Sequence, residues 1–126
     1  MLRYITLGTN DVARAARFYD AVLAPLGYVR RATFDDEVGY GAPGAPVKFW
    51  VTRPFDGKAA SVGNGSMPAL VAPSRAAVDA CHAAGLANGG TDEGAPGLRR
   101  YSPDFYACYL RDPDGNKLSA VCDAPQ

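Results

Sequence analysis

The sequence predicts an α+β fold made of two βαβββ units that follow one another along the chain. The elements occur in the order strand, helix, three strands, and the order repeats after a Gly-rich segment. Tyr4 and Met67 take equivalent places at the start of the two halves. The second half closes with a hairpin around the turn DPDGN, where Pro113 and Gly115 suit the central turn positions.

Length and composition indicate one domain, residues 1–126, with enough apolar residues to bury a core. The formal net charge is zero and no basic block occurs, which argues against a nucleic-acid partner. No apolar run reaches membrane-spanning length, so no membrane partner is expected. The first residues, MLRYITLG, lack the long apolar segment of a signal peptide, and we expect a cytoplasmic protein.

The first unit, residues 1–53, begins with a strand at residues 3–8. Asn10 or Asp11 caps the helix that follows. Gly27 suits the helix C-terminus, where a residue with a left-handed backbone conformation is common. One face of this helix is apolar at helical spacing, formed by Val12, Ala16, Tyr19, Leu23 and Leu26. The segments YVRRATF, EVGYGAP and VKFWVTR then predict three strands.

Residues 54–66 are polar and Gly-rich and read as a linker, and residues 67–123 form the second unit. MPALVA predicts a strand, Ser74 caps the second helix, and Gly89 and Gly90 end it. TDEGAPGLRR reads as irregular, with room for a short edge strand. Units this short do not easily bury a sheet face alone, so the halves should share a core or pair with a second chain. The sheet faces without a helix would then line a cavity.

Three stretches together resemble the vicinal oxygen chelate superfamily, which includes glyoxalase I, bleomycin-resistance proteins, fosfomycin-resistance enzymes and extradiol dioxygenases. They are ITLGTNDVARAARFYDAVLAPLGY, APSRAAVDACHAAGLANGG and YLRDPDGNKLSAVC. The resemblance covers nearly the whole chain. It implies paired βαβββ modules, a curved mixed sheet around a small-molecule cavity, and a homodimer.

The resemblance also implies four positions for ligands of a divalent metal, where the superfamily's enzymes normally carry His or Glu. In this chain they fall on Tyr4, Trp50 (Phe49 if the register slips by one), Met67 and Ser119. A phenol with a pKa of about 10, an indole, a soft thioether and a neutral hydroxyl are poor ligands for such an ion. We therefore expect no metal site and no cofactor.

His82, the only histidine, offers a metal ligand or a general base in principle. We favour a helix residue at the edge of the packed face, because this helix should cover the sheet on the side away from the cavity. An odd number of cysteines without a CxxC pair indicates buried thiols at Cys81, Cys108 and Cys122.

The acidic residues are interpreted without catalytic roles. Two short clusters read as solvated loops, and two further residues serve the hairpin turn through local backbone hydrogen bonds. The clusters are Asp35, Asp36 and Glu37, and Asp92 with Glu93; the turn residues are Asp112 and Asp114.

Strand alternation and the face that carries the metal in the family together place six side chains at the cavity, namely Tyr4, Thr6, Lys48, Trp50, Met67 and Ser119. Two aromatic residues on or beside strands, Tyr101 and Tyr106, complete the candidate ligand-binding residues. Lys48 is the one cation placed there, either to pair with a ligand carboxylate or to sit at the rim in water. Aromatic walls with a few polar groups suit a flat, partly apolar organic molecule such as an aromatic compound. The alternative is that these side chains fill the cavity.

Three functions stay open at this point. The first is a metal-free, glyoxalase/bleomycin-resistance-like small-molecule-binding protein. The second is an enzyme of the superfamily, a lyase, isomerase or dioxygenase, with an atypical metal site. The third is a structural or regulatory subunit of a dimer with a filled cavity.

Overall fold

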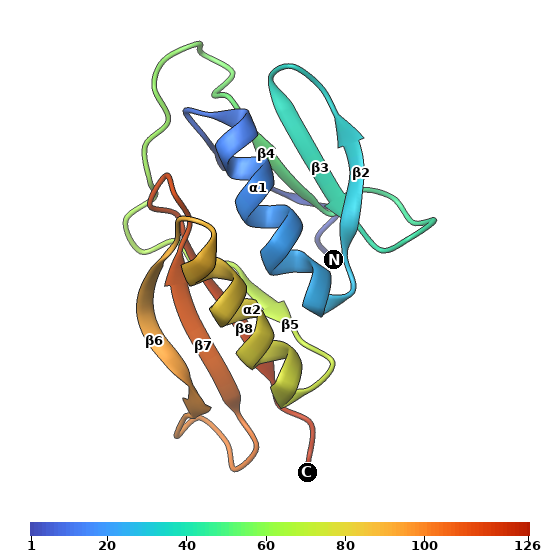
Figure 1. The fold of residues 1–126 in the computed structure, drawn as a ribbon, viewed down its shortest axis with the longest axis vertical. Helices are drawn as coiled ribbons and strands as arrows, with labels where there is room; N and C mark the ends of the chain where they lie inside the picture. Colours follow the sequence, from blue (N-terminus) through green and yellow to red (C-terminus); the bar gives the residue numbers. More distant parts are fainter.

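The computed structural model describes residues 1–126 as two βαβββ modules that lie side by side (Figure 1). The first module contains β1 (Ile5–Gly8), α1 (Val12–Leu23), the short 3₁₀ helix η1 (Ala24–Leu26), β2 (Val29–Thr33), β3 (Glu37–Gly41) and β4 (Phe49–Thr52). The second contains β5 (Ala69–Val71), α2 (Arg75–Ala87), β6 (Thr91–Leu98), β7 (Tyr106–Arg111) and β8 (Lys117–Cys122). The predicted α+β fold with paired modules is confirmed.

Each module forms one four-stranded mixed sheet, in the orders β1-β4-β3-β2 and β5-β8-β7-β6. The first strand of each module pairs in parallel with the last one, and the other pairs are antiparallel. The two sheets therefore have equivalent topology. Neither of them closes into a barrel.

The helix starts follow the predicted capping chemistry. The Asp11 carboxylate accepts a hydrogen bond from the Arg14 backbone N–H at 3.0 Å, and the Ser74 hydroxyl accepts one from Ala77 at the same distance. Gly27 ends the first helical segment with a φ of 89°, a left-handed value that glycine adopts without steric cost.

Residues 91–98 form strand β6 at the edge of the second sheet, so the predicted edge strand is present and is longer than the irregular segment suggested. This strand pairs antiparallel with β7, with register shifts between Asp92 and Gly94 and between Gly94 and Gly97. Its Gly and Pro content gives it little strand propensity of its own. The hydrogen bonds to β7 therefore stabilise an extended conformation that the local sequence does not favour.

Both helices lie on the same side of the sheets, in front of them in Figure 1. One continuous hydrophobic core fills the space between the helices and the sheet faces they cover. It includes Phe18 and Tyr19 of α1, Phe49 of β4 and Leu110 of β7. The three cysteines are buried in it as free thiols, as predicted.

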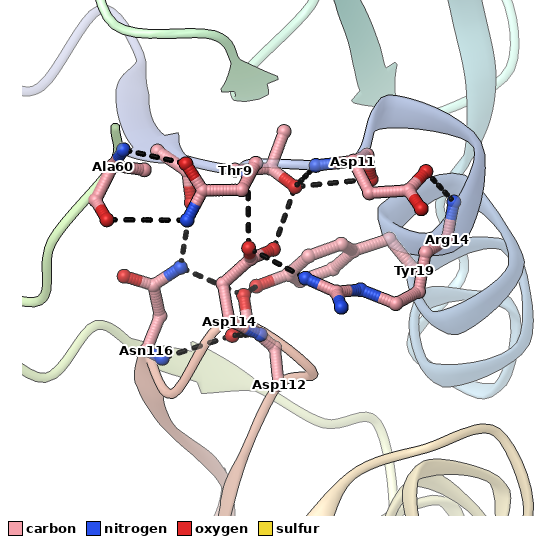
Figure 2. A network of polar contacts seen from close by, with 10 residues as sticks. Thr9, Asp11, Arg14, Tyr19, Ala60, Asp112, Asp114 and Asn116 are labelled. Atoms are coloured by element: carbon pink, nitrogen blue, oxygen red, sulfur yellow. Dashed lines mark hydrogen bonds and ion pairs between the residues drawn. The ribbon is translucent and has the colours of Figure 1, made fainter. Parts of the chain in front are cut away.

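The turn of the closing hairpin docks on the first module (Figure 2). Asp112 is buried, and its Oδ2 accepts hydrogen bonds from the Tyr19 hydroxyl at 2.6 Å and from the Asn116 side-chain amide at 2.8 Å. Its Oδ1 accepts from the backbone N–H groups of Asp114 and Asn116, both at 2.9 Å. Asp112 therefore orders its own turn and also binds helix α1 of the other module.

Asp114 makes the second part of this junction. Its carboxylate accepts from the Thr9 hydroxyl at 2.6 Å, from the Asn10 backbone N–H at 2.9 Å and from the Arg14 guanidinium at 2.8 Å. The Asn116 amide also donates to the Gly8 carbonyl at 2.9 Å. The interpretation of the turn acids as purely local was incomplete, because they fix the β7–β8 hairpin against the end of β1 and the start of α1.

None of the helices combines the length and the apolar character that a membrane-spanning segment requires.

Candidate functional site

The sheet faces turned away from the helices carry the candidate site, and we call them together the open face. On β4, Phe49 and Val51 belong to the core, so Trp50 belongs to the open face, as does Lys48 directly before the strand. On β8, Leu118 and Ala120 belong to the core. The alternating residues of β8, including Ser119, belong to the open face.

The larger hollow of the open face lies over the second sheet, and we call it the second-sheet hollow. It has a volume of about 610 Å³. Its walls combine aromatic side chains, small apolar side chains and three charged groups. The lining residues are Met67, Ala69, Glu93, Arg99, Tyr101, Phe105, Tyr109, Lys117, Ser119 and Val121.

Two cations flank Tyr109 in this hollow. The Arg99 guanidinium carbon lies 5.3 Å from the centre of the Tyr109 ring, and the Lys117 Nζ lies 5.8 Å from it. Neither cation forms an ion pair. The Ser119 side chain is 2% exposed, and its hydroxyl has no hydrogen-bond partner.

A second hollow of about 530 Å³ lies where β1 and β5 approach each other, and we call it the junction hollow. It is mostly apolar, and it shares Met67 and Ala69 with the second-sheet hollow, so the two adjoin. Its lining residues are Leu2, Tyr4, Ile5, Tyr28, Lys48, Phe49, Met67, Pro68, Ala69 and Leu70.

The structure distributes the predicted site residues over several places. Met67, Tyr101 and Ser119 line the second-sheet hollow, and Tyr4 and Lys48 line the junction hollow with Met67.

Thr6 lines a smaller, polar recess of about 190 Å³ beside the linker. Trp50 is half-buried and lines neither the second-sheet hollow nor the junction hollow. Its ring packs on Gly39 of the neighbouring strand, where an added Cβ would lie 2.7 Å from the indole.

Tyr106, a predicted cavity residue, lines neither the second-sheet hollow nor the junction hollow. Its hydroxyl donates to the Asp79 carboxylate of α2 at 2.6 Å, and the Arg75 guanidinium lies 5.3 Å from the ring centre. The hydrogen bond to Asp79 raises the pKa of Tyr106. Tyr106 is an even number of residues from Cys108 and Leu110, so it shares their helix-facing side of β7.

His82 joins α2 to β6 on the covered side of the sheet. It is 8% exposed, and its Nε2 lies 2.8 Å from a carboxylate oxygen of Asp92. This hydrogen bond lowers the pKa of Asp92. His82 lines neither the second-sheet hollow nor the junction hollow, and Asp92 belongs to a strand rather than to the predicted solvated loop.

The side chains at the four family metal positions do not suit a divalent ion. Tyr4 and Ser119 line different hollows, Met67 lines both, and Trp50 lines neither. No group of three or more His, Cys, Asp or Glu side chains gathers anywhere in the chain as a metal site would require. The donors at these positions are a phenol, a thioether and a hydroxyl, which form a poor set for zinc or for a harder ion.

Comparison with solved structures decides the family. No protein-family model matches the chain, and no curated protein matches it. A crystal structure of a glyoxalase/bleomycin resistance protein from Albidiferax ferrireducens T118 superposes with a TM-score of 0.84 at 42% sequence identity, covering 94% of each chain. The chain belongs to the glyoxalase/bleomycin resistance protein family. The predicted resemblance to the vicinal oxygen chelate superfamily is thereby confirmed.

More distant members of this family share the fold. A glyoxalase/bleomycin resistance protein/dioxygenase family enzyme from Burkholderia phytofirmans PsJN has a TM-score of 0.72 at 17% identity over 98% of both chains. A glyoxalase-related enzyme from Fulvimarina pelagi has a TM-score of 0.73 at 20% identity, covering 96% of this chain and 86% of that one. At these identities the likeness concerns the fold alone.

Sequence reasoning missed the two cations of the second-sheet hollow. Lys48, the one cation predicted at the cavity, is exposed at the junction hollow. The signal for Lys117 was present, because it lies two residues from Ser119 on the same strand. Arg99 follows the end of β6 in a segment without periodicity, so only the fold shows its position.

Proposed function

We propose that this family member is a small-molecule-binding protein that works without a divalent metal. The observation that carries this proposal is the second-sheet hollow, whose volume lies within the range of small-molecule sites. Tyr101 and Phe105 form an edge-to-face pair there, with ring centres 5.1 Å apart, and Tyr109 adds a third ring. Aromatic walls of this kind favour a flat, partly apolar organic ligand.

We propose in addition that a second copy of the chain covers part of the open face, forming a homodimer. Large apolar side chains on this face are unusually exposed, with Tyr4 at 54% and Val71 at 77%. Burying such side chains against a second chain would remove apolar surface from water, which is favourable by about 25 cal/mol per Å². Light scattering coupled to size exclusion should give twice the mass of one chain, and a monomer at micromolar concentration would contradict the dimer.

A thermal-shift screen tests the binding proposal directly. A ligand that binds only the folded state raises the melting temperature, by an amount that grows with its concentration. We expect flat aromatic compounds to be enriched among those that raise it. A broad library without any shift would instead favour the alternative that the protein is a structural or regulatory subunit.

Metal analysis of protein purified without added metal separates the binding proposal from the enzyme alternative. We expect less than stoichiometric Zn, Ni, Mn and Fe, and no loss of melting temperature on dialysis against a chelator. One equivalent of any of these metals would overturn the metal-free proposal and favour an enzyme with an atypical site.

A further inference from the structure

We propose that the second-sheet hollow binds an organic carboxylate, with a flat apolar body between the aromatic walls and the anionic group beside Arg99 and Lys117. This inference rests on the proposed function and adds the charge of the ligand to it. It depends on the charges that line the hollow, on the way Arg99 is held, and on the polar group at Ser119.

The hollow carries excess positive charge. Arg99 and Lys117 both line it and both lack an ion-pair partner. The only acid in the lining, Glu93, accepts a hydrogen bond from the Arg111 guanidinium at 2.6 Å. Arg111 therefore balances Glu93, and two cations remain for a ligand.

Arg99 is held in place without being neutralised. Its Nη2 donates to the Ala95 carbonyl at 2.6 Å, and its only other hydrogen bond is a long one of 3.4 Å to the Leu98 carbonyl. A Cβ added at Gly97 would lie 3.0 Å from Nη1, so the guanidinium lies directly beside a strand position without a side chain. A guanidinium has five N–H groups, so this one keeps donors for a carboxylate.

The ring of Tyr109 lies close to both cations of the hollow. Both cations lie within about 6 Å of its centre, the range of a cation–π contact. Such contacts favour a defined position for a flexible side chain, which lowers the entropy cost when an anion binds. An anion beside Tyr109 would therefore meet two cations that are already positioned.

Ser119 lies on the strand beside Tyr109 and lines the same hollow. It is the cross-strand partner of Tyr109, and its hydroxyl is buried without a hydrogen-bond partner. A buried hydroxyl without a partner is unfavourable in the free protein. The hollow thus combines free cations, an unsatisfied hydroxyl and apolar walls, which is the composition expected of a site for an amphipathic anion.

Three probes with the same ring system test the sign of the charge. 2-Naphthoate is anionic, 2-naphthamide is neutral and 2-naphthylmethylamine is cationic, and calorimetry on the full chain measures their affinities. At low salt, about 50 mM, we expect the naphthoate to bind roughly tenfold more tightly than the amide, and the amine to bind most weakly. At about 500 mM salt the advantage of the naphthoate should shrink.

Substitutions then locate the anion. Arg99→Gln and Lys117→Gln should each weaken naphthoate binding about fivefold and leave naphthamide binding unchanged. Lys58→Gln is the matched control, because Lys58 is exposed in the linker and lines neither the second-sheet hollow nor the junction hollow, and it should leave both affinities unchanged. Circular dichroism and the melting temperature establish that each variant is folded.

The outcomes separate this inference from the proposed function. If the amide or the amine binds as tightly as the naphthoate, the anion proposal is wrong and small-molecule binding stands. Naphthoate binding that is insensitive to both substitutions, or equally sensitive to Lys58→Gln, also overturns it. If none of the three probes binds and the thermal-shift screen is empty, both proposals fail.

Discussion

Replacing Tyr19 with Phe removes one hydroxyl from the junction between the modules and leaves the aromatic ring in the core. The hydroxyl donates to the buried Asp112 carboxylate at 2.6 Å. A hydrogen bond to a charged group contributes about 1.5–3 kcal/mol to stability. Asp112 keeps three further donors, from Asp114 and Asn116, so the variant does not leave a bare buried charge. We therefore expect Tyr19→Phe to lower the free energy of unfolding by about 2 kcal/mol, below the 3–5 kcal/mol of a fully broken buried ion pair.

Urea unfolding followed by circular dichroism measures this loss. An unchanged m-value would show that the variant exposes as much surface on unfolding as the original protein does. Tyr101→Phe is the matched control, because Tyr101 is 71% exposed and should change the free energy by less than about 0.5 kcal/mol. In an Asp112→Asn background, Tyr19→Phe should cost less, since the acceptor no longer carries a charge. A loss below about 0.5 kcal/mol for Tyr19→Phe alone would refute the role given to this hydrogen bond.

Three further predictions concern single groups. Burial and then the Asp112 charge raise the pKa of Tyr19 well above its usual value. The contribution of Tyr19 to the free energy of unfolding should therefore be fully present below about pH 10 and be lost as the pH rises further, so that stability falls more steeply than in Tyr19→Phe. Urea unfolding across this pH range measures the fall, and equal slopes for the two proteins would contradict the prediction. Ser119→Ala removes the unpartnered hydroxyl and should raise the free energy of unfolding by about 1 kcal/mol, whereas a decrease would show that the hydroxyl is satisfied. A hydrogen bond with Cys108, followed by burial, raises the pKa of the Cys81 thiol, and Cys122 is buried too. A thiol reagent should therefore label none of the three cysteines before unfolding and all of them afterwards.

The parts of the fold that could be predicted from sequence are those that depend on neighbours along the chain. Helix caps at Asp11 and Ser74, the left-handed Gly27 and the DPDGN turn are determined within a few residues. Strand alternation likewise separates Leu118 from Ser119, because the period of two is a property of the strand itself. The same rule applied to β7 would have placed Tyr106 with Cys108 on the covered side.

The parts that could not be predicted depend on residues far apart in the sequence. Asp112 and Tyr19 are separated by 93 residues, and nothing near either one indicates the other. The partner of His82 is Asp92, on a segment without strand propensity that becomes β6 only by pairing with β7. Arg99 reaches the second-sheet hollow only because β6 is a strand, so interpreting this segment as largely irregular also meant missing the cation.

Strand β8 explains how a family member can keep the fold while its open face changes. Leu118 and Ala120 face the core, and Asn116 at the preceding turn donates to the Gly8 carbonyl of the other module. Lys117 and Ser119 face the hollow and make none of these contacts. A substitution at Ser119 therefore alters the chemistry of the open face without disturbing the packing that holds the modules together. This separation of two faces on one strand allows a hydroxyl to occupy Ser119, the position at which the resemblance to the superfamily implies a metal ligand, without loss of the fold.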